Sequence, residues 1–94
     1  MAATKKSASA LAEERAIAAE IAKAHEFSAH LRVGPHEKYT ERGFPTYEAA
    51  REAADKLEAQ HSRFGRGAVV YAINRLGSFD CTPELIALAR EIAA

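Results

Sequence analysis

The sequence predicts one α+β domain with the element order α-β-β-α-β-β-α, in which an antiparallel sheet carries helix 46–61 across one face. Three observations support this class. Apolar residues recur at helical spacing in 46–61 and near both termini. They alternate with polar residues in 27–33, and β-branched and aromatic residues dominate 68–73. The 94 residues suit a single modest core, so we assign 9–94 to the domain and 1–8 to a flexible tail.

Amphipathic helices are predicted at both ends of the chain. The first begins after Ser9, which can act as its N-cap, and extends to about His25. The last begins after Thr82, with Pro83 at its first position. Their apolar stripes leave two arrangements open. The helices cover the second face of the sheet, or one of them buries its stripe against another chain.

Two strand pairs flank the central helix, for which Thr46 is the predicted N-cap. Residues 27–33 and 38–44 form a hairpin around a turn that contains Gly34 and Pro35. Alternation in the first strand places Ser28, His30 and Arg32 on its polar face. The second pair comprises 68–73 and 78–81. In the first of these we expect Val69, Tyr71 and Ile73 to pack under the helix.

The charges of the chain cancel, because it has 13 basic and 13 acidic residues. Net charge therefore gives no reason to expect a polyanionic partner. Locally, however, residues 61–79 contain three arginines and no acid. Nucleic-acid binding is thus an alternative function, carried by arginines of the sheet face and of this segment. These candidate site residues are Arg32, Arg42, Arg63, Arg66 and Arg75.

Residues 42–55, RGFPTYEAAREAAD, resemble the strand-to-helix segment of the AP2-type DNA-binding domain. The matching positions are Gly43, Phe44, Thr46 and the run Glu48–Ala49–Ala50. The resemblance implies DNA contacts from an exposed sheet face that carries Arg32, Lys38 and Arg42. That family uses a three-stranded sheet with tryptophans, whereas this chain has no tryptophan and two strands before the helix. The segment RGAVVYAI offers one aromatic where an RNA-recognition strand needs several, so we do not assign that family.

The sequence lacks the motifs of common enzymes, including a phosphate loop, a dinucleotide fingerprint and a nucleophile elbow. The histidine spacing does not force convergence on a metal ion. The single cysteine, Cys81, cannot form an intramolecular disulfide and fits a reducing compartment. We therefore expect no enzyme activity, no cofactor and no metal. A thiol-dependent activity at Cys81, beside the start of the last helix, is a remote alternative.

The favoured function is a small non-enzymatic binding or regulatory domain that acts through protein–protein contacts, with a homodimer as one form of them. A small sheet has edges that can pair with partners, and the terminal helices carry apolar stripes. The sequence has no segment long enough to span a membrane. The short apolar run after Lys5 and Lys6 does not make a signal peptide, so we expect a cytoplasmic protein.

Overall fold

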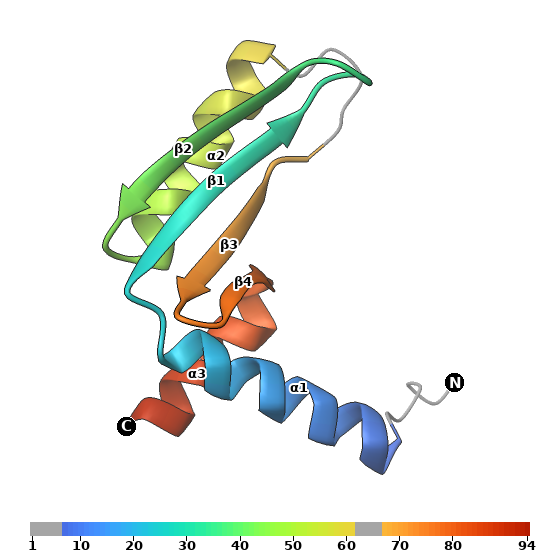
Figure 1. Ribbon diagram of the computed structural model, residues 1–94, viewed down its shortest axis with the longest axis vertical. Helices are drawn as coiled ribbons and strands as arrows, with labels where there is room; N and C mark the ends of the chain where they lie inside the picture. The colour runs from blue at the N-terminus through green and yellow to red at the C-terminus, as the bar shows by residue number, and fades with distance from the viewer. Residues whose placement is uncertain (1–6, 62–66) are drawn as a thin grey trace.

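The computed structural model describes residues 7–61 and 67–94, and it has the predicted α+β class and element order (Figure 1). Four strands form one antiparallel sheet in the order β2-β1-β3-β4. The elements are α1 (Ala8–Ala22), β1 (Glu26–Arg32), β2 (Lys38–Phe44), α2 (Tyr47–His61), β3 (Val69–Asn74), β4 (Gly77–Cys81) and α3 (Pro83–Ala93).

Helix α2 covers one face of the sheet, as predicted (Figure 1). Its N-cap is Thr46, whose Oγ1 accepts a hydrogen bond from the Ala49 amide at 3.2 Å. The buried side of α2 is rich in alanine and includes Leu57. It packs on the buried side chains of the central strands β1 and β3, among them Leu31 and Val70. The alanines let the helix approach the sheet closely, so the core is thin.

The predicted orientation of β3 was wrong. Val70 and Ala72 are buried on the helix side, whereas Val69, Tyr71 and Ile73 lie on the opposite face, where Val69 is 36% exposed. The sequence AVVYAI is apolar at every position, so alternation cannot tell which residues face the helix. Pairing with β1 determines which side chains of β3 face the helix, because it sets Val70 opposite the buried Ala29.

The terminal helices pack against each other at the end of the sheet where β4 lies (Figure 1). The N-cap of helix α1 is Ser7, two residues before the predicted cap Ser9. The helix ends at Ala22 rather than near His25. Its end is fixed to β3, because Asn74 Nδ2 donates to the Glu20 carbonyl at 2.8 Å. Helix α3 has the predicted cap, with the Leu85 amide donating to Thr82 Oγ1 at 3.2 Å.

Both terminal helices lie on the same side of the sheet as α2. Ala18 and Ile21 of α1 and Ile86 and Ala89 of α3 belong to the core cluster that contains the buried residues of α2. Asn74, which holds α1, follows Val70 and Ala72 on the helix side of β3. In the described part of the chain, therefore, the terminal helices do not cover the second face of the sheet, which was one of the two arrangements left open.

Candidate functional site

The side of the sheet that no described helix covers is the candidate site, and we call it the open face. Strand register places polar and basic residues of β1 and β2 on it, next to apolar residues of β3 and polar residues of the edge strand β4. Its members are Glu26, Ser28, His30, Arg32, Lys38, Thr40, Arg42, Val69, Tyr71, Ile73, Ser78 and Asp80.

Two cations lie together at one end of the open face. Arg32 of β1 is directly opposite Lys38 of β2, and both side chains are exposed. Neither has an ion-pair partner within residues 7–61 and 67–94. Like charges that face each other across a strand pair destabilise it. The fold gains nothing from this pair, which makes Arg32 and Lys38 candidates for binding an anion.

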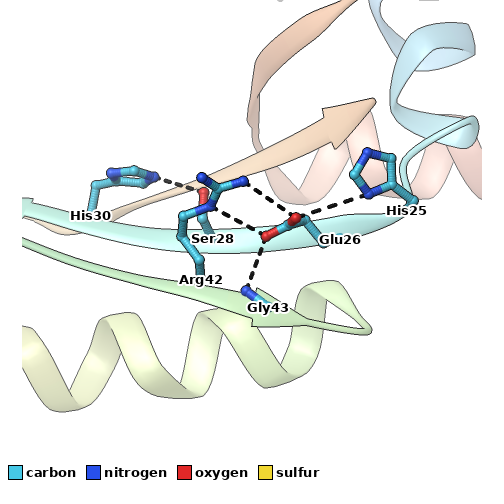
Figure 2. Close-up of polar contacts among 6 residues, drawn as sticks. All are labelled: His25, Glu26, Ser28, His30, Arg42 and Gly43. Atoms are coloured by element: carbon cyan, nitrogen blue, oxygen red, sulfur yellow. Dashed lines mark hydrogen bonds and ion pairs between the residues drawn. The ribbon is translucent and has the colours of Figure 1, made fainter. Parts of the chain in front are cut away.

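A third cation, Arg42, lies on the same face but is paired with Glu26 (Figure 2). Arg42 Nη2 is 3.3 Å from Glu26 Oε1, and the Gly43 amide donates to Glu26 Oε2 at 3.1 Å. Gly43 has a φ of +85°, a conformation that favours glycine. The hydrogen bond from Arg42 lowers the pKa of Glu26 below its ordinary value. Glu26 is therefore ionised at neutral pH and offsets the charge of Arg42.

His30 lies at the centre of the face. One ring nitrogen, Nε2, is 2.7 Å from the Ser28 hydroxyl, and the other, Nδ1, is 3.4 Å from Thr40 Oγ1. Ser28 lies along β1 and Thr40 across on β2, so the two contacts hold the imidazole flat over the sheet. Figure 2 shows His30 and Ser28 on the side of the sheet away from α2. Burial, followed by the charges of Lys38 and Arg42, lowers the pKa of His30. The imidazole is therefore neutral at pH 7.

Tyr71 stands next to His30. The two ring centroids are 4.8 Å apart and the ring planes meet at 83°. Such an edge-to-face arrangement is a favourable geometry for aromatic rings. With the imidazole flat over the sheet, the phenol ring stands upright beside it. The imidazole thus offers a flat surface, and the phenol ring bounds that surface on the side of β3.

The Ser28–His30 pair has the short separation of a nucleophile and its base, but it lacks the other requirements of that chemistry. Ser28 is fully buried, so its hydroxyl cannot reach a substrate. The second nitrogen of His30 faces the hydroxyl of Thr40, whereas a catalytic histidine is usually oriented by a carboxylate. We therefore assign this pair a positioning role, which is to fix the plane of the imidazole.

A shallow depression joins the cations to the rings. It has a volume of about 360 Å³. The side chains of Arg32 and Lys38 border it at one end, and those of His30 and Tyr71 at the other. Val69, an exposed apolar side chain, also lines it. Positive charge, aromatic rings and apolar surface thus meet in one place.

The predicted arginines do not all meet there. Arg32 borders the depression, and Arg42 lies on the same face. Arg75 lies in the turn between β3 and β4, near Glu20 and Lys23, at the other end of β3 from Val69. Arg63 and Arg66 fall outside the described residues.

Of the residues that line the depression, Arg32 alone was in the predicted set. Lys38 was implied by the family resemblance alone, and a symmetric hairpin around the expected 34–37 turn would have paired it with Val33. In the structure β1 ends at Arg32 and β2 begins at Lys38, so residues 33–37 connect the two paired cations. His30 was placed on the polar face of its strand but given no binding role. Tyr71 was missed because the sequence analysis placed it on the helix side of β3 rather than on the open face.

Cys81 has none of the features of a reactive thiol. It is 8% exposed, and burial raises its pKa to about 11. This is opposite to the lowering that the start of a helix can produce. In the described ranges, no three histidine, cysteine or acidic side chains are grouped so that they could hold a metal ion. Nor is any helix there both long and apolar enough to cross a membrane.

Comparison with protein-family models, with curated proteins and with solved structures gives no match for this chain. The functional argument therefore depends on the open face itself. What that face offers is a set of binding groups: exposed cations, a fixed imidazole and an upright phenol.

Proposed function

We propose that this protein is a non-enzymatic binding module and that the open face of its sheet binds nucleic acid. The observation that carries the proposal is the depression in which Arg32 and Lys38 adjoin His30 and Tyr71. Cations bind phosphates, and aromatic rings bind the faces of bases. This favours nucleic-acid binding, the alternative function, over the protein–protein contacts that the sequence favoured.

The charge of the open face supports the proposal although the whole chain is neutral. Glu26 is the acid on β1, and it is occupied by Arg42. Asp80 lies on β4, two strands away from β1. The β1–β2 half of the face therefore keeps an excess of positive charge from Arg32 and Lys38. A local patch of this kind can bind a polyanion without a basic protein around it.

Fluorescence anisotropy with labelled 12-nucleotide single strands and duplexes tests the proposal. We expect binding at low salt that weakens as salt rises. The double variant Arg32→Gln/Lys38→Gln should lose at least tenfold in affinity. It should also flatten the log–log salt dependence for a single strand by about 1.4, because each lost phosphate contact accounts for about 0.7.

The control removes the same two charges elsewhere. Arg15→Gln/Lys56→Gln changes one arginine and one lysine on the exposed sides of α1 and α2, away from the open face. This control variant should bind with the affinity and salt dependence of the wild-type protein. No binding at low salt, or equal losses in the two double variants, would refute the proposal.

A second candidate function is association with another protein or a second copy through α1 and α3. Its support is the exposed apolar side chains of these helices: Leu11 is 50% exposed, Ile17 37% and Ile92 41%. Sedimentation at several concentrations tests self-association. A concentration-dependent dimer that Leu11→Glu abolishes would support it, and a monomer throughout would remove it.

A further inference from the structure

We infer that the open face is specific for a single strand, with the sugar–phosphate backbone along the β1–β2 half and a base stacked on His30 beside Tyr71. This inference rests on the proposed function and names the ligand class and its orientation. A duplex keeps both faces of each base inside its own stack, so it has no base face to offer to these rings. A single strand offers bases and phosphates together.

The first step is the surface on which a base would stack. A flexible histidine loses freedom when it binds, but His30 is already held at both ring nitrogens by Ser28 and Thr40. Its ring face points away from the sheet, as Figure 2 shows. Tyr71 stands upright at 83° to it and limits how far a base can slide toward β3.

The second step is the distance from the rings to the cations. Arg32 is two residues beyond His30 on β1, and Lys38 is two residues before Thr40 on β2. Residues two apart on a strand lie on the same face, about 7 Å from each other. Long arginine and lysine side chains can cover that distance to the phosphate of the nucleotide whose base lies on His30.

The third step is the direction of the strand across the face. Asp80 of β4 lies opposite Tyr71, on the far side from Arg32 and Lys38, and it is exposed. Its carboxylate repels phosphate. The sugar–phosphate backbone is therefore favoured over β1 and β2, with the base pointing inward toward β3. The depression of about 360 Å³ is at the small end of ligand pockets, which suits a base and its sugar.

The experiment measures the affinities of a 12-nucleotide single strand of DNA, the RNA of the same sequence and the matching DNA duplex. We expect at least one single strand to bind tenfold or more tightly than the duplex. Tyr71→Ala and His30→Ala should each weaken single-strand binding about tenfold and leave duplex binding unchanged. Tyr71→Phe keeps the ring and should bind the single strand with the affinity of the wild-type protein. Asp80→Asn should strengthen single-strand binding, since it removes the repelling charge.

If an alanine variant fails to fold, NMR of the wild-type protein tests the stacking on His30 independently. On addition of the single strand, the ring protons of His30 should shift upfield in the NMR spectrum, as stacking under a base requires. Equal affinity for duplex and single strand, or His30 signals that do not move at saturation, would overturn the inference and leave the proposed function standing. Absence of binding to any of the three probes would overturn both.

Discussion

Arg32 and Lys38 face each other directly across β1 and β2, two exposed cations without an acidic partner in the described ranges. Opposite charges at such a position stabilise a sheet, whereas like charges destabilise it. Lys38→Glu should therefore raise the free energy of unfolding by about 0.2–1 kcal/mol and at the same time abolish nucleic-acid binding. Urea unfolding and anisotropy measure the two effects.

Lys56→Glu is the control for this prediction. Lys56 lies on the outer side of α2, with Nζ 3.6 Å from Glu52 Oε1. Reversing its charge breaks a favourable pair, so it should lower the stability by about 0.3 kcal/mol and leave binding unchanged. If Lys38→Glu also lowers the stability, the pair does not oppose folding and loses its value as a sign of function.

The stability of the fold should fall in mild acid because of His30. Its pKa is lowered in the folded state, so the unfolded chain binds the proton more readily. This contribution to stability is complete above the unfolded pKa of about 6.5 and is lost as the pH falls from there through the lower folded pKa. Urea unfolding between pH 5 and 8 measures it.

His30→Asn should flatten that pH dependence, and His36→Asn, in the exposed turn after β1, should not. The opposite sign is expected for binding, because a protonated His30 adds a positive charge to the open face. Single-strand affinity should therefore rise as the pH falls from 7.5 to 5.5. A pH dependence of stability that persists in His30→Asn would assign the effect to another group.

The orientation of β3 predicts different costs for two adjacent valines. Val70→Ala removes buried methyl groups from the helix side and should lower the free energy of unfolding by about 1–3 kcal/mol. Val69→Ala, on the open face, should cost less than about 1 kcal/mol. Equal losses in urea unfolding would contradict the orientation of the strand.

Cys81 should resist alkylation in the folded protein. A thiol with its pKa raised to about 11 is almost entirely protonated at pH 7.5, and burial blocks the reagent. Labelling with iodoacetamide, followed by mass spectrometry, should be slow in buffer and rapid in 6 M urea. Rapid labelling in buffer would restore the thiol-dependent function as a candidate.

The parts of the fold that could be predicted are those with a local signal. Thr46 and Thr82 are capping residues followed by helical patterns, and the alternation of β1 fixed which of its side chains are polar. The orientation of β3 had no local signal, since each of its residues up to Ile73 is apolar. The side taken by α1 depends on the contact of Asn74 with Glu20, which are far apart in the sequence.

The residues of the candidate site also differ in whether a local sequence signal could place them on the open face. Arg32 could be placed because β1 alternates, and Arg42 because it lies on the strand paired with β1. The role of Tyr71 depends on the orientation of β3, so the sequence could not bring it to His30. Pairing between strands, rather than any motif, assembles the depression.

The three helices of residues 7–61 and 67–94 lie on one side of the sheet, so the proposed binding surface is separate from the side on which the helices pack. Side chains of the open face can change without disturbing the contacts between the helices and the sheet. A library that randomises Arg32, Lys38, Thr40, Val69 and Tyr71 should therefore yield many folded members with different binding preferences. The same backbone could serve as a scaffold for binding ligands of other kinds.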